Sequence, residues 1–127
     1  MALDRDSPHL PYPATIESYG NGGFRFAGMS HHGSILCISE GIWASNETVP
    51  AAIGEATLAL VFSSRPAIEH FLIGTGRDPW RIPETLRARF REHGIVAEAM
   101  STAAAVSTYN TLLAERRRIG ALLIAVA

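Results

Sequence analysis

The chain has 127 residues, of which 47% are hydrophobic and 18% are charged. This size and composition suit one folded domain and exclude wholesale disorder, because the apolar residues suffice to build a single core. The formal net charge of -1 gives no electrostatic footprint for nucleic acid, whose binding normally requires a basic face, so no nucleic-acid partner is predicted.

The cysteine content and the longest apolar run predict a cytoplasmic protein. The single cysteine, Cys37, cannot form an internal disulfide, and the first residues lack the pattern of a secretory signal. The longest apolar run, Ile119–Ala127, is too short to cross a bilayer. No membrane span is therefore predicted, while peripheral association with a membrane stays compatible with the sequence.

Prolines mark the start of the chain. Pro8, Pro11 and Pro13 remove backbone donors and disfavour both helix and central strand. We therefore expect a flexible arm over residues 1–13 and a single domain over residues 14–127.

Glycine-rich turn signals divide the first part of the domain. Gly20–Gly23 and His31–Gly33 contain residues that tolerate positive φ, and short apolar runs lie around them. This spacing predicts an antiparallel meander with strands at Thr15–Tyr19, Phe24–Met29, Ser34–Ile38 and Gly41–Ala44. In the ambiguous stretch that follows, Thr48–Ser64, we expect a short helix rather than a strand.

The second half of the chain alternates between strand and helix patterns. Buried apolar runs suggest strands, and helices are indicated by Pro83 at a first turn, Gly94 at an end, and Ser101 or Thr102 as a cap. The predicted order is β-α-β-α-β, which makes the chain an α/β protein. Its elements are expected at Ile68–Ile73, Pro83–His93, Ile95–Ala99, a helix carrying Val106, Tyr109 and Leu113, and Ile119–Val126.

The sequence contains no recognisable catalytic or metal-binding constellation. His31 and His32 are adjacent, so their side chains would point in opposite directions and could not easily share a metal. Cys37 lies among apolar residues and is interpreted as a small buried hydrophobe. No catalytic residue, metal or cofactor is predicted, although an unrecognised enzyme activity stays open.

The most suggestive local feature is the turn Gly74-Thr75-Gly76-Arg77-Asp78. It leaves the carboxyl end of a buried strand, where ligands of α/β proteins commonly bind. The stretch lacks the lysine of a Walker loop and the third glycine of a dinucleotide fingerprint. Two interpretations stay open: an anion or nucleotide site, or a tight structural turn held by an Arg77–Asp78 or backbone contact.

The last predicted helix supplies the other candidate residues. Thr102 is suited to cap its start, and the small residues after it allow close packing against the sheet. Asn110 falls in mid-helix, where its intrinsic propensity is unfavourable, so a specific hydrogen bond is expected from it.

Four motifs together resemble the Mth-type domain family, which includes the mitochondrial complex I assembly factor 3 group. They are Tyr19–Phe24, Gly33-Ser34, Gly74–Gly76, and Thr102–Asn110 with Glu115–Arg117. The resemblance implies a three-layer α/β fold with a mixed central sheet and no established enzyme activity. For the mitochondrial relatives it implies a part in building respiratory complex I. The chain departs from the family's helix motif at Val106 and Ser107, where cysteine and arginine are expected.

These observations favour a non-catalytic protein-binding or assembly module whose partners are other proteins. Its predicted interaction surface is a groove between Gly74–Asp78 and the helix residues Thr102, Tyr109 and Asn110. The alternative is a small-ligand or anion-binding protein with a site at the Gly74–Asp78 turn and the Ser101 helix start, where Arg77 would carry recognition. Self-association is also compatible with the sequence, since Trp43, Phe71 and Trp80 could supply an exposed apolar patch if any of them lies outside the core.

Overall fold

The computed structural model describes residues 8–127. Eight strands, three α-helices and one short 3₁₀ helix succeed one another along this part of the chain. In order they are β1 (Ile16–Gly20), β2 (Gly23–Phe26), β3 (Met29–His32), β4 (Ser34–Ile38), β5 (Gly41–Ser45), η1 (Pro50–Ala52), α1 (Glu55–Phe62), β6 (His70–Gly74), α2 (Glu84–Glu92), β7 (Val96–Met100), α3 (Thr102–Ala114) and β8 (Ile119–Leu123).

A mixed five-stranded sheet forms the centre of the molecule, in the order β5-β4-β8-β6-β7. Strands β8, β6 and β7 are parallel, whereas β4 is antiparallel to both β8 and β5. The register of β6 and β8 runs from His70 opposite Ile119 to Gly74 opposite Leu123. The α/β class, the mixed sheet and the predicted pairing of these two buried strands are confirmed.

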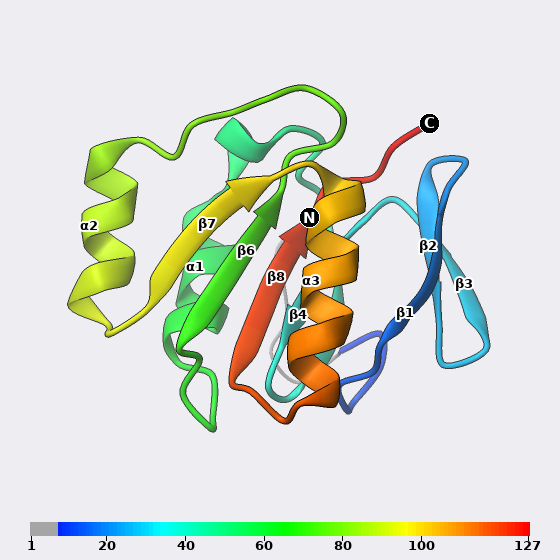
Figure 1. Cartoon of the computed structure of the whole chain (residues 1–127), viewed down its shortest axis with the longest axis horizontal. Helices are drawn as coiled ribbons and strands as arrows, with labels where there is room; N and C mark the ends of the chain where they lie inside the picture. The colour runs from blue at the N-terminus through cyan, green and yellow to red at the C-terminus, as the bar shows by residue number, and fades with distance from the viewer. Residues whose placement is uncertain (1–7) are drawn as a thin grey trace.

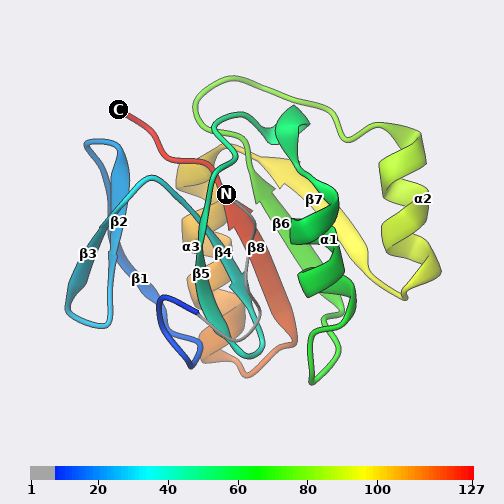
Figure 2. The same cartoon turned by 180° about the vertical axis from the view of Figure 1, so that it is seen from behind.

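Helices cover the two faces of this sheet because the chain reverses direction across it. It steps outward from β6 to β7 through α2, and then back past β6 to β8 through α3. Since crossovers between parallel strands are right-handed, opposite steps place their helices on opposite faces. Figure 1 shows α3 in front of the sheet, and Figure 2, from behind, shows α1 in front of it with α2 at the β7 margin.

The predicted single meander is divided between two sheets, which corrects the first half of the prediction. Strands β1, β2 and β3 form a separate three-stranded sheet, while β4 and β5 join the central one. The expected strand Phe24–Met29 is broken by a two-residue turn, in which Ala27 has φ of 49° and Gly28 of 73°. Alanine is an unusual residue at positive φ, so the sequence carried a weak turn signal there. His31 and His32 consequently lie in β3 rather than in a turn.

Apolar side chains pack on both faces of the central sheet. Leu36, Phe71 and Ile73 belong to the cluster beneath α1 and α2, and Cys37 and Leu72 to the cluster beneath α3 and the small sheet. Trp43 and Phe71 are buried and Trp80 packs partly against the first cluster, so Trp43 and Phe71 lie in the core and do not supply an exposed apolar patch.

The expected flexible arm is anchored at Leu10, which is buried. Its backbone N–H donates to the Ile42 carbonyl at 3.0 Å, and the Ile42 N–H donates back at 2.9 Å. This bridge covers part of the free edge of β5, a common way to protect an edge strand. Residues 1–7 of the predicted arm lie outside the described residues.

Candidate functional site

The predicted Gly74–Gly76 turn and Thr102 meet at the carboxyl ends of the parallel strands. The fully buried Thr102 hydroxyl accepts a hydrogen bond from the Gly76 N–H at 2.9 Å and donates to the Ile124 carbonyl at 2.7 Å. The Thr102 N–H in turn donates to the Gly76 carbonyl at 2.9 Å. One threonine therefore ties the end of β6, the start of α3 and the segment after β8 together.

The packing around Gly74 leaves little room for a side chain. A Cβ on Gly74 would lie 3.1 Å from the Thr102 Cα and 3.1 Å from a Leu123 methyl group. Gly76 adopts a φ of 83°, which other residues rarely take. Both glycines thus serve close approach and turn geometry within the protein.

Several backbone donors near this turn are engaged in hydrogen bonds within the protein. The Gly76 N–H donates to the Thr102 hydroxyl, and the Thr102 N–H donates to the Gly76 carbonyl. The Ala104 N–H donates to the Ser101 hydroxyl at 3.2 Å. The Ala105 N–H bonds to the Ser101 carbonyl at 2.8 Å. An anion at the start of α3 would have to compete with these bonds.

The contact that holds the turn differs from the expected Arg77–Asp78 pair. The Thr75 hydroxyl donates to the Asp78 carbonyl at 2.8 Å, which is the backbone version of the prediction. The exposed Arg77 guanidinium donates instead to the Ala127 carbonyl at 2.7 Å. Arg77 thereby connects the turn to the end of the described chain.

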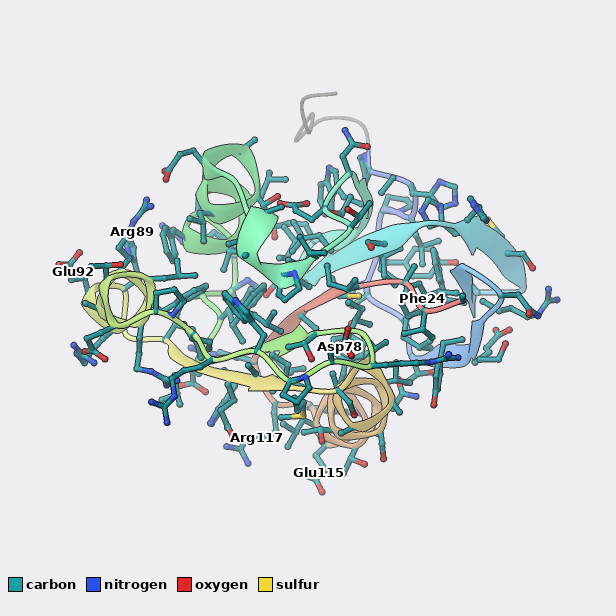
Figure 3. The ribbon with its side chains drawn as sticks, turned by 90° about the horizontal axis from the view of Figure 1, so that it is seen from above. Phe24, Asp78, Arg89, Glu92, Glu115 and Arg117 are labelled. Atoms are coloured by element: carbon teal, nitrogen blue, oxygen red, sulfur yellow. The ribbon has the colours of Figure 1, made fainter. Side chains whose placement is uncertain are left out.

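Above the turn lies a cleft of about 220 Å³, which we call the carboxyl-end cleft. Its apolar wall comes from Trp80, Ala99 and Met100, and Figure 3 shows Asp78 in the loop that crosses the strand ends. Its residues are Thr75, Arg77, Asp78, Pro79, Trp80, Ala99, Met100 and Ser101. An apolar wall beside one cation, one carboxylate and hydroxyl groups can receive a side chain of mixed polarity.

Tyr109 and Asn110 do not line this cleft. Tyr109 is buried beside Cys37, where burial raises the pKa of the tyrosine and raises the pKa of the Cys37 thiol to about 12. Asn110 faces β1: its amide group donates to the Ile16 carbonyl and accepts from the Ile16 N–H, both at 2.8 Å. The hydrogen bond expected of Asn110 is therefore present, and it serves packing between α3 and the small sheet.

Sequence reasoning missed the apolar wall of the carboxyl-end cleft. Pro79 and Trp80 follow the glycine turn directly, and Ala99 and Met100 precede Ser101. A signal was available, because the last residues of a parallel strand and the loop after its neighbour meet at the same sheet edge.

A larger hollow of about 400 Å³ lies on the three-stranded sheet, between residues of β1, β2 and β3. Its cation, Arg25, already pairs with Glu17 at 3.3 Å and donates to the Ser30 hydroxyl at 3.0 Å. His31 also lies there. Its pKa is lowered mainly by burial and, to a smaller extent, by the nearby His9. The described residues contain no cluster of three or more side chains able to hold a metal.

Residues 16–124 match the family model described as "Protein of unknown function (DUF498/DUF598)". A relative from Xenopus tropicalis, named NADH dehydrogenase [ubiquinone] 1 alpha subcomplex assembly factor 3, is 32% identical over 96% of this chain. The chain spans 65% of that relative's length.

Solved structures have the same fold. A Bartonella henselae protein, described as an outer membrane protein, superposes with a TM-score of 0.87 at 49% identity, covering 94% of this chain and all of its own. A Bordetella pertussis protein described as a Mth938-like domain gives a TM-score of 0.74 at 25% identity, covering 100% of this chain and 95% of its own. Within residues 8–127, no helix has the length and apolar character needed to span a membrane.

Proposed function

This chain belongs to the DUF498/DUF598 family of proteins of unknown function, and from that premise we propose that it is a non-catalytic protein-binding module that assists the assembly of a larger complex. Its resemblance to the Mth-type domain family is confirmed. The observation that carries the proposal is the similarity, over nearly the whole chain, to a protein named as an assembly factor for NADH dehydrogenase.

The proposed contact surface is the carboxyl-end cleft. The Thr102 hydrogen bonds hold its base rigid, so a partner side chain would enter a preformed site and little conformational entropy would be lost on binding. Trp80 and Met100 supply apolar area, while Arg77 and Asp78 at the rim supply polar contacts that fix orientation. This arrangement supports protein binding better than chemistry on a bound substrate.

We place this activity in the cytoplasm as part of the same proposal. Cys37 is free and buried in the core, so the fold draws no stability from a disulfide. A reducing compartment would therefore not weaken the protein.

The proposal is tested by deleting the gene in its native host and measuring assembled NADH dehydrogenase by native electrophoresis and NADH oxidation. The deletion is expected to lower the level of the assembled enzyme, and the wild-type chain is expected to restore it. Arg77→Glu reverses a charge at the cleft and should restore it poorly, whereas Arg81→Glu, at an exposed site outside the cleft lining, should restore it fully. An unchanged enzyme level in the deletion strain would contradict the assembly role, and equal rescue by both variants would contradict the cleft as its surface.

The second candidate function is binding of a small anion in the same cleft, and the exposed Arg77 on its lining is the observation that favours it. Phosphate, nucleotides and carboxylates are screened by thermal shift against the wild type and Arg77→Ala. A true ligand raises the melting temperature of the wild type only, because it must stabilise the native state through Arg77. Absence of a shift, or equal shifts in both proteins, would exclude this function.

A further inference from the structure

A second surface, at the opposite end of the parallel strands, combines an apolar groove with three adjacent arginines. The groove has a volume of about 260 Å³ and lies where α3 ends and β8 begins. Pro13, Pro66 and Leu113 provide its apolar walls, and Arg116, Arg117 and Arg118 line it as well. We call this surface the basic groove.

The arginines of the basic groove have no carboxylate partner among the described residues. Arg25, Arg89 and Arg91 each form a salt bridge, whereas Arg116–Arg118 are exposed and form none with residues 8–127. Glu115 precedes Arg116 in the chain, and the Glu69 N–H donates to the Arg118 carbonyl. Neither glutamate lines the groove. Figure 3 shows Glu115 and Arg117 at the margin of the molecule, directed away from the ribbon. Of residues 8–127, the groove therefore presents three cations to solvent and no carboxylate lines it.

The backbone at this site is also unusual for the residue it carries. Arg116 follows the end of α3 with a φ of 61°, in the left-handed region where helices normally end on glycine or asparagine. An L-residue with a long side chain is disfavoured there. Strained positions of this kind often mark function, so the arginine side chain is the feature to explain.

We propose that the basic groove binds an acidic segment of a partner protein, with one apolar side chain seated against Leu113 and carboxylates paired with the three arginines. The positive groups are all guanidinium groups, whose planar donors match carboxylates in bidentate pairs. The groove is concave and receives a protruding side chain, which a flat membrane surface does not offer. An acidic peptide therefore fits both its charge and its shape.

Binding of an acidic segment at the basic groove does not depend on whether complex assembly is the chain's role. The basic groove lies near the amino end of β8, and the carboxyl-end cleft lies near Thr75 and Met100 at the other end of the strands. Two partners could therefore occupy the chain at once without overlap, which is the geometry an adapter requires.

The test is a titration of the full isotope-labelled chain, followed by NMR, with an acetylated probe peptide of glutamates around one central leucine. A peptide with glutamines in place of the glutamates is the matched probe. We expect the amide signals of Leu113, Arg116–Arg118 and Ile119 to move, with a dissociation constant below about 1 mM at low salt, and the binding to weaken as salt is raised. The glutamine peptide should bind far more weakly.

Variants localise the contact. Arg117→Gln with Arg118→Gln should weaken binding of the glutamate peptide about tenfold, since two charge pairs are lost, while Arg81→Gln with Arg91→Gln makes the same charge change elsewhere and should not. The spectrum of each free variant checks that its fold is intact. The proposal is overturned if the peptide moves no groove signal, if both double variants weaken binding equally, or if vesicles of anionic phospholipid bind at the groove and the peptide does not.

Discussion

Replacing Asn110 by alanine is expected to loosen the three-stranded sheet from α3. The Asn110 side chain acts as a short strand partner for β1, since it bonds both the N–H and the carbonyl of Ile16 at 2.8 Å. Ile16 is only 4% exposed, so water reaches its polar backbone groups poorly once the amide is removed. The variant therefore loses two hydrogen bonds and leaves two partly buried groups unsatisfied.

The magnitude follows from these contacts. Two neutral hydrogen bonds contribute about 2 kcal/mol in net terms, and poor rehydration of their partners adds to the loss. Alanine favours the helix over asparagine by roughly 0.6 kcal/mol, which offsets part of it. We expect the free energy of unfolding to fall by about 2–3 kcal/mol.

Chemical denaturation measures that loss, and hydrogen exchange shows where it falls. Ser107→Ala is the matched control, because Ser107 is exposed on the same helix and gains only helix propensity. Amide protection at Ile16 and its β1 neighbours should decrease in Asn110→Ala and stay unchanged in the control. If both variants unfold at the same denaturant concentration with β1 protection intact, Asn110 does not hold the small sheet in place.

Thr102→Val keeps the shape of the side chain but removes both hydrogen bonds of its hydroxyl, so it should lower the free energy of unfolding by about 2–4 kcal/mol. Thr102→Ser keeps the hydroxyl and should unfold close to wild type. Equal denaturation midpoints for the two variants would contradict this role of the hydroxyl. Burial raises the pKa of Cys37 to about 12, so a thiol reagent at pH 8 should label it only after unfolding, and rapid labelling of the native protein would refute its burial. Hydrogen bonding from Arg89 lowers the pKa of Glu55 below its ordinary value of 4.5, so the pair stabilises the fold above that value and the stabilisation is lost as the pH falls through the lowered pKa. The difference in melting temperature between wild type and Glu55→Gln should therefore vanish in acid, and a constant difference across that range would show that another interaction is responsible.

Part of the carboxyl-end cleft, the Gly74–Asp78 turn and the start of the following helix at Ser101, could be predicted from the sequence. The Gly74–Asp78 turn after a buried strand and the cap at Ser101 are local signals, and a parallel sheet places both at one edge. Tyr109 and Asn110 do not line this cleft, and the sequence could not show that, because it gives their helical spacing but not the neighbour that each side chain faces. Tyr109 lies beside Cys37 and Asn110 bonds to Ile16, and both neighbours are distant in sequence.

Local sequence patterns predicted the order and type of most helices and strands. Apolar runs, helix caps and glycine stops specified β6, α2, β7, α3 and β8, because hydrophobic periodicity and capping act over a few residues. The same patterns fixed Cys37 as a core residue. For these elements the sequence alone determined the order and type, although β8 ends at Leu123 and not at the expected Val126.

Only the tertiary structure decided how the first strands are shared between two sheets and which polar groups face one another. The turn at Ala27-Gly28 and the left-handed Arg116 go against local preference, so neither could be read from the amino-acid pattern. The bridge from Leu10 to Ile42, the Asn110 contact with Ile16 and the basic groove all join segments that are far apart in sequence. Such contacts depend on packing of the complete chain, which no local pattern encodes.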